Sequence, residues 1–267
     1  MKRHNALILA FVLFFAGLSS LPASVFADYD KEITFRGLPM GSSIEEIKSK
    51  LLEDGVSETE FKFSSNSEMS TLFSLFYEDK YEFSWIKDGG YHAYIMDTGK
   101  LELAGYDDFS LNLDFMYEVV DGVPNKNQNN AGLSAARYYI NCTEYDQLKV
   151  FSDLKQKLIT LYGTPSETLS MAEKFGEKDK IRNLEIWYGA NNTVVFICRV
   201  WFTNDGVTAI KEESPSFYYA ADDVVYVFYG KTDSIEKFKL LQDYENRLAN
   251  EAEQKKLEKV VNDTTGL

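Results

Sequence analysis

The histidines and cysteines of this chain are too few to build a familiar reaction centre. There are two of each, and His92 is the only histidine beyond the first few residues. A Ser-His-Asp triad would have to use His92, yet no serine stands in a Gly-x-Ser-x-Gly sequence. One histidine and two cysteines that lie far apart in the sequence also make an incomplete set of zinc ligands. We therefore expect His92 to occupy an ordinary strand position, and we predict no metal, no cofactor and no catalytic residue.

Two adjacent acid pairs could support hydrolysis or bind calcium. Asp107-Asp108 and Asp222-Asp223 offer carboxylates of the kind that glycosidases use and that calcium prefers. Both pairs lie where a strand is expected to begin or to turn, and the chain contains 42 acidic residues. We favour solvated turn positions for both pairs. A cell-wall or glycan hydrolase that uses a carboxylate pair remains the alternative function.

Aromatic residues are the more informative excess, with 17 Tyr, 19 Phe and 3 Trp. Tyr138-Tyr139 and Tyr218-Tyr219 are adjacent pairs, and successive residues of a strand point to opposite faces. One tyrosine of each pair must therefore face away from the core. An exposed row of these four tyrosines is a candidate contact surface for a protein or glycan partner. The alternative is that these tyrosines lie at half-exposed edges of the sheet and have no binding function.

Cys142 and Cys198 are a candidate disulfide. In the chain-entropy account such a bridge would stabilise the fold by about 4 kcal/mol. The alternative is a pair of buried thiols on neighbouring strands, because Cys198 lies in the middle of an apolar segment. The sequence leaves both interpretations open, since it does not give the Cα separation that a disulfide requires.

The first 27 residues are typical of a secretory signal peptide. A basic start at Lys2 and Arg3 is followed by an apolar run over residues 6–18 and by small residues before a cut after Ala27. An uncleaved anchor is the alternative, but the run is short for a span of about 20 residues. We expect a secreted or periplasmic, extracytoplasmic protein with no stable membrane insertion after cleavage.

The net charge of the chain excludes some classes of binding partner but does not identify one. The formal net charge is −14 and the sequence pI is about 4.7. A chain this acidic is repelled by nucleic acid and by anionic lipid, so we expect no nucleic-acid partner. Its length is sufficient to bury a sizeable core as one large domain or two small ones.

One apolar segment and three amphipathic segments are the elements that we expect to position the candidate site residues. Thr193–Phe202 is almost entirely β-branched or aromatic, which predicts a central strand with at least one covered face. Ser42 or Ser43 caps a helix that closes at Asp54-Gly55, and the acid three residues after either serine completes a capping box. A second helix is predicted around an apolar stripe, and a third begins near residue 232 and extends to about 260 with a solvated far end. The stripe consists of Leu148, Phe151, Leu154, Leu158 and Leu161.

The remaining extended segments are short and separated by turn residues. Turns are predicted at residues 88–90 and 97–99, and polar stretches at 121–130 and 173–182. Strands are predicted at 81–86, 91–96, 100–106, 111–119, 135–142, 184–188 and 224–229. Short turns between strands indicate antiparallel pairing. The order predicts an α+β fold of two tandem units, each a helix packed on an antiparallel sheet: residues 28–142 and 143–231, followed by a C-terminal helix and tail at 232–267.

Three short motifs resemble known tandem repeats. Met40-Gly41-Ser42-Ser43-Ile44-Glu45-Glu46-Ile47, Tyr162-Gly163-Thr164-Pro165 and Val200-Trp201-Phe202-Thr203-Asn204-Asp205-Gly206-Val207 are similar to the helix starts, helix ends and late strands of small α/β repeats. Such repeats occur in β-lactamase inhibitory protein and in the outer-membrane assembly lipoproteins. The present chain departs from them in having no lipidation cysteine and no Gly-led start to its second helix. The resemblance implies an exported protein that works by surface contact.

These observations predict an exported, non-catalytic binding protein or cell-envelope-associated protein, with a protein or glycan partner. The carboxylate-pair hydrolase is the rival from a different class. Self-association through the helix that begins at Ser234 is a third possibility. The sequence does not fix the oligomeric state.

Overall fold

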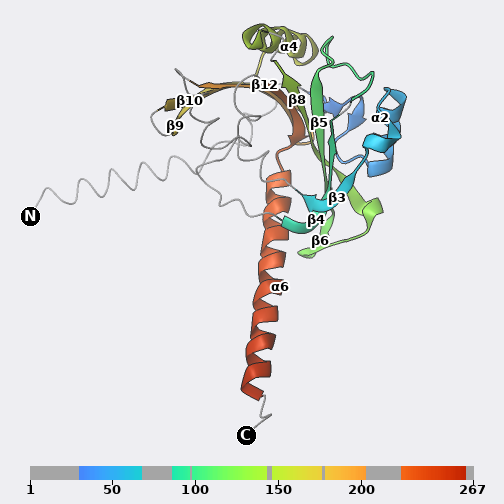
Figure 1. The fold of residues 1–267 in the computed structure, drawn as a ribbon, viewed down its shortest axis with the longest axis vertical. Helices are drawn as coiled ribbons and strands as arrows, with labels where there is room; N and C mark the ends of the chain where they lie inside the picture. The colour runs from blue at the N-terminus through green and yellow to red at the C-terminus, as the bar shows by residue number, and fades with distance from the viewer. Residues whose placement is uncertain are drawn as a thin grey trace, which may run out of the picture.

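The centre of the fold is one continuous eight-stranded antiparallel sheet (Figure 1). The computed structural model describes residues 30–67, 86–96, 98–142, 146–175, 178–202 and 224–262. In spatial order the strands are β3 (Phe63–Ser67), β4 (Ile86–Ile95), β5 (Phe109–Tyr117), β8 (Ala131–Asn141), β12 (Val224–Lys231), β11 (Thr193–Phe202), β10 (Lys178–Tyr188) and β9 (Glu167–Phe175). Every neighbouring pair is antiparallel. The predicted α+β class with an antiparallel sheet is therefore confirmed.

Shorter elements connect these strands. They are β1 (Thr34–Phe35), β2 (Leu38–Pro39), β6 (Val119–Val120), β7 (Val123–Pro124) and the 3₁₀ turns η1 (Glu58–Glu60) and η2 (Gln128–Asn130). β1 pairs with β2, and β6 pairs with β7, each across a two-residue turn.

The first helix begins as its capping sequence predicts. In α2 (Ile44–Glu53), Ser43 Oγ accepts a hydrogen bond from the backbone N–H of Glu46, and the Glu46 carboxylate accepts one from the backbone N–H of Ser43. This reciprocal pair satisfies two N–H groups that a helix start would otherwise leave unpaired. Ile44, Ile47 and Leu51 are buried against the sheet. The cap at Ser43 therefore sets where this apolar stripe begins.

The second helix, α4 (Gln147–Tyr162), is also confirmed, although its buried stripe is shorter than predicted. Asp146 caps its start by accepting a hydrogen bond from the backbone N–H of Lys149. The buried residues are Val150, Phe151, Leu154 and Leu158. Leu148 and Leu161 are 56% and 61% exposed, so the buried stripe does not extend to either of them.

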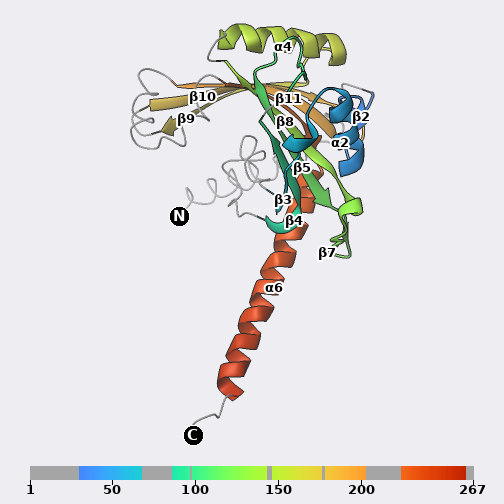
Figure 2. The same ribbon diagram turned by 45° about the vertical axis from the view of Figure 1, so that its right-hand side comes forward.

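Two hydrophobic clusters lie on opposite faces of the sheet. The larger joins the buried residues of α2 and α4 to one face of β4, β5, β8, β11 and β12. The smaller lies on the other face of β8, β10, β11 and β12. The predicted central strand β11 contributes to both: Val195 and Ile197 face the helices, while Phe196 and Cys198 belong to the smaller cluster. Figure 2 shows both helices on the same side of the sheet.

The structure departs from the sequence predictions at three places. β4 continues through Asp88-Gly89-Gly90, which was expected to be a turn. A Cβ atom on Gly90 would lie 1.9 Å from the Phe115 carbonyl oxygen, so this glycine permits close approach of β4 to β5. Residues 100–106 do not form a strand; Leu103 and Tyr106 are joined by an isolated bridge across a tight turn. In the polar stretch, residues 173–175 belong to β9 and residues 178–182 belong to β10, and the two strands pair at the sheet edge.

The third helix points away from the sheet. α6 (Ser234–Asn262) starts directly after β12, and its free end extends beyond every other described element (Figures 1 and 2). Leu241 is buried, whereas Leu248 and Leu257 are exposed, so the predicted solvated far end is confirmed. Within the part of the chain that the structure describes, no helix combines the length and apolar character needed to cross a membrane.

Candidate functional site

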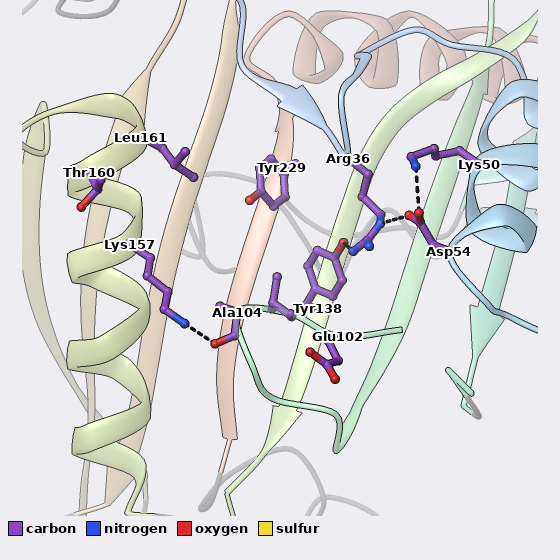
Figure 3. Close-up of a pocket in the computed structure, with 11 residues that line it drawn as sticks. Arg36, Lys50, Asp54, Glu102, Ala104, Tyr138, Lys157, Thr160, Leu161 and Tyr229 are labelled. Carbon is purple, nitrogen blue, oxygen red and sulfur yellow. Dashed lines mark hydrogen bonds and ion pairs between the residues drawn. The ribbon is translucent and has the colours of Figure 1, made fainter. Parts of the chain in front are cut away.

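A groove of about 600 Å³ lies between α2 and α4 above the middle of the sheet (Figure 3). This volume is within the range of small-molecule sites. The residues that line it are Arg36, Lys50, Asp54, Glu102, Leu103, Ala104, Tyr138, Lys157, Thr160, Leu161 and Tyr229. They come from the β1–β2 turn, the end of α2, the loop before β5, strands β8 and β12, and the last turns of α4.

Two phenols contributed by the paired strands β8 and β12 line the bottom of the groove. Tyr138 and Tyr229 have ring centroids 6.3 Å apart and an edge-to-face orientation. Tyr138 is 1% exposed, and burial raises its pKa to about 12. Burial also raises the pKa of Tyr229 well above its usual value. Both phenols are therefore neutral near pH 7, where they can exchange hydrogen bonds but do not act as bases.

Arg36 enters the groove from the β1–β2 turn and is held by two partners. Its Nε donates to Asp54 Oδ2 at 2.5 Å, and its Nη1 donates to the Tyr138 hydroxyl at 3.2 Å. Lys50 Nζ donates to the other Asp54 oxygen at 2.7 Å. Arg36 is thus fixed between the end of α2 and the floor of the sheet, as Figure 3 shows.

Asp54 is an ionised structural partner in this arrangement. Burial alone would raise the pKa of Asp54, but hydrogen bonds and positive charge from Lys50 and Arg36 outweigh burial and hold the pKa below its usual value. A general acid of a glycosidase needs the opposite shift, so that the carboxyl group keeps its proton near neutral pH. Asp54 is therefore unsuited to that role.

The turns on two sides of the groove have an unusual residue at their first position. Arg36-Gly37 and Ala104-Gly105 each have positive φ at both residues, 52° and 84° in the first and 58° and 91° in the second. Two-residue hairpin turns of this kind favour Asn or Asp first, because those residues tolerate the left-handed conformation. Asp121-Gly122 and Asn191-Asn192, which lie outside the groove, follow that preference.

The wall opposite Arg36 combines a cation with apolar side chains. Lys157 Nζ, on α4, donates a hydrogen bond to the Ala104 carbonyl oxygen and so ties that helix to the second turn. Leu103, Ala104 and Leu161 supply apolar surface. The groove therefore offers a fixed guanidinium at one end, two neutral phenols below it and an opposite wall of apolar side chains with Lys157, and Glu102 also lines it.

The predicted tyrosine surface is divided between the two faces of the sheet. Tyr138 is buried in the groove region, so it does not form part of an exposed row. Tyr139 is half-buried on the opposite face, where its hydroxyl accepts a hydrogen bond from Tyr226 at 3.2 Å. Tyr218 and Tyr219 lie outside the described residues.

Neither Cys142 nor Cys198 forms a disulfide. Cys142 belongs to the cluster under the helices, and Cys198 belongs to the cluster on the other face. β12 also separates β8 from β11, so the expectation of neighbouring strands is wrong. The candidate bridge is not made because the two thiols are buried on opposite sides of the sheet.

His92 takes the predicted strand position, paired with an acid that sequence reasoning missed. Its Nδ1 lies 2.8 Å from Asp114 Oδ1, and both side chains are buried. Asp107 and Asp108 are exposed before β5, as expected of turn residues, and Asp222-Asp223 lies outside the described residues. Among the described residues, no group of three or more His, Cys, Asp or Glu side chains could hold a metal ion.

Sequence reasoning also missed Arg36 and Asp54 as site residues. The available signal was the Arg-Gly pair between two extended segments, because arginine is an unusual choice for a left-handed turn position. No protein-family model, curated protein or solved structure matches this chain.

Proposed function

We propose that this is an exported, non-catalytic binding protein whose groove between α2 and α4 takes a small ligand with an apolar body and an anionic end. The observation that carries this proposal is Arg36. It occupies a left-handed backbone position that costs about 1–2 kcal/mol, and its side chain is held inside the groove by Asp54 and Tyr138. Backbone strain of this kind is concentrated at binding sites.

Arg36 retains capacity for a ligand after its protein contacts are made. A guanidinium group has five N–H donors in a fixed plane. Its hydrogen bonds to described residues use Nε and Nη1, so the remaining N–H groups are available to ligand oxygens. A pre-positioned arginine loses little side-chain entropy on binding, which favours paired contacts with a carboxylate or sulfonate.

The protonation states of the groove favour binding over acid–base chemistry. Asp54 stays ionised because its pKa is lowered, and the phenols stay neutral because their pKa values are raised. None of these three groups changes its protonation near neutral pH, where a general acid or base operates. This supports the binding protein over the carboxylate-pair hydrolase.

We also propose that the chain consists of the two predicted tandem units, joined through one sheet. The order of elements supports this: α2 precedes the strands β3, β4, β5 and β8, and α4 precedes β9, β10, β11 and β12. The last strands of the two sets pair at the middle of the sheet. Tyr138 comes from the first set and Tyr229 from the second, so the groove would lie at the junction of the units. The same order of helix and strands supports the proposed resemblance to β-lactamase inhibitory protein and the outer-membrane assembly lipoproteins.

Export through a leader cut after Ala27 is part of the proposal and rests on the sequence of residues 1–27. Mass spectrometry of the protein secreted by a bacterial expression host tests it. We expect a mature N-terminus at Asp28, and an intact Met1 on the recovered protein would refute it.

The binding proposal is tested by titration with 1-anilinonaphthalene-8-sulfonate, which has an apolar ring system and an anionic end. Saturable binding is expected, and Arg36→Gln should weaken it by at least about fivefold. Leu161→Glu should abolish it, because Leu161 lines the groove. Leu148→Glu is the matched control, because this leucine is exposed on the same helix outside the groove. Equal affinity in all four proteins would refute the proposal.

A further inference from the structure

Arg137 is a buried cation with no hydrogen-bond partner among the described residues. It lies on β8 with 7% of its surface exposed, and its Nε is fully buried and unpaired. No ion pair joins it to an acid in the part of the chain that the structure describes. Buried arginine side chains are almost always paired, since leaving a guanidinium out of water without acceptors is costly. The buried Nε of Arg137 is therefore a donor that has no acceptor among the described residues.

The described residues next to Arg137 in the strand register are uncharged. Strand register places Asn112 of β5 on one side of it and Phe228 of β12 on the other. Tyr139 stands two residues along the same strand, and Tyr226 pairs with Tyr139 across the strands. Burial raises the pKa of both phenols, although the Arg137 charge lowers it in part. They therefore remain neutral and do not neutralise the guanidinium.

Asp114, an acid on this face of the sheet, already has another partner. Asp114 lies two residues from Asn112 on β5 and directly opposite His92 on β4. The Asp114 carboxylate is 2.8 Å from His92 Nδ1. Asp114 pairs with Ala135, two residues from Arg137 on the same strand, and an acid in that position disfavours a doubly charged ligand such as a phosphate dianion more than a singly charged one. The charge pattern therefore favours a single negative charge.

We propose that Arg137 marks a second binding site, on the sheet face opposite the helices, that takes a carboxylate-bearing ligand. The planar guanidinium matches two carboxylate oxygens, and Asn112, which is also buried, adds an amide donor next to it. The phenol edges of Tyr139 and Tyr226 bound the site on the side of β12. This site is independent of the groove, because Tyr138 and Tyr139 point to opposite faces of β8.

Thermal unfolding in acetate tests this inference with the simplest carboxylate. The wild-type protein should show a saturable rise in Tm with acetate at constant ionic strength, larger than the rise with inorganic phosphate. Arg137→Met and Arg137→Gln should both lose the acetate effect. Arg247→Met is the matched control and should keep it, because Arg247 is an exposed arginine on α6.

The same variants show whether Arg137 instead has a structural partner elsewhere in the chain. With chloride as the only small anion, Arg137→Met should have an equal or higher Tm than the wild type, because it removes an unpaired buried charge. A markedly lower Tm in both Arg137 variants would overturn the inference, since it would indicate a lost internal ion pair. An acetate effect that survives in Arg137→Met would overturn it too, and a stronger phosphate effect would overturn the carboxylate assignment.

Discussion

Arg36 Nε and Asp54 Oδ2 are 2.5 Å apart, and this contact joins the first hairpin of the fold to the end of its first helix. Asp54 is also the C-cap residue of α2. Asp54 therefore ends the helix through its backbone N–H, while its carboxylate accepts hydrogen bonds from Lys50 and Arg36 and orients the guanidinium towards Tyr138. The geometry of the groove depends on this one acid.

Asp54→Asn should lower the free energy of unfolding at neutral pH by about 2 kcal/mol, because hydrogen bonds between charged groups are lost. Asp153→Asn is the matched control. Asp153 also accepts a hydrogen bond from a lysine four residues earlier on its helix, and another from the Tyr106 hydroxyl, but its side chain is 43% exposed, so a smaller loss is expected. Urea denaturation of the three proteins makes the comparison. Equal losses in the two variants would contradict the role of Asp54.

The stability contributed by Asp54 should depend on pH in the acid range. Its pKa is lower in the folded protein than the value of about 3.9 expected in the unfolded chain. The contribution is thus complete above the unfolded value and is lost as pH falls through the folded pKa. From about pH 5 to about pH 2, the wild type should lose more unfolding free energy than Asp54→Asn. Parallel curves would show that the Asp54 pKa is not lowered.

Ala104→Asn should stabilise the protein by about 0.5–1 kcal/mol, because asparagine tolerates positive φ better than alanine does. The bond from Lys157 is to the Ala104 backbone carbonyl, so it should survive the change. Asp121→Ala makes the reverse change in a turn with similar φ values and should destabilise by a comparable amount. Differential scanning calorimetry measures both, and shifts of the same sign would contradict the turn argument.

Much of the fold could be predicted because its signals are local. Ser43 and Glu46 specify the start of α2, and the apolar run of β11 specifies a strand wherever its neighbours lie. β4 was misjudged because Asp88-Gly89-Gly90 resembles a turn, whereas Gly90 is needed for contact with the backbone at Phe115. The strand at 184–188 was predicted, but β9 and the first part of β10 were missed, because strands at a sheet edge tolerate polar sequences that remove the apolar alternation.

The groove could not be predicted because it depends on contacts between distant segments. Tyr138 and Tyr229 come together only when β8 pairs with β12. Arg36 reaches Asp54 only after α2 has packed on the sheet. Adjacent tyrosines were recognised as facing opposite ways, but the sequence does not say which of Tyr138 and Tyr139 lies under the helices.

Gly90→Ala should destabilise the protein by more than about 3 kcal/mol, because the added methyl group would collide with the Phe115 carbonyl inside the sheet. Gly105→Ala is a useful comparison, since no atom lies within 4 Å of its would-be Cβ, leaving only the cost of positive φ. Thermal unfolding measures the difference. A smaller loss for Gly90→Ala than for Gly105→Ala would contradict the described contact of β4 with β5.

Cys142 and Cys198 should both react slowly with Ellman's reagent in the folded protein and rapidly in denaturant, because they are buried on opposite faces of the sheet. Two thiols per chain should be counted under denaturing, non-reducing conditions. A count of zero thiols, or a change in gel mobility on reduction, would show a bridge between them. Either result would require a different pairing of strands around β12.

The structure of the complex with 1-anilinonaphthalene-8-sulfonate tests the central claim most directly. We predict that the ring system lies between α4 and the Tyr229 side of the groove, with the sulfonate within hydrogen-bond distance of the Arg36 guanidinium. The Arg36–Asp54 contact should be unchanged. A probe bound elsewhere in the crystal of the complex, with the groove empty, would contradict the account.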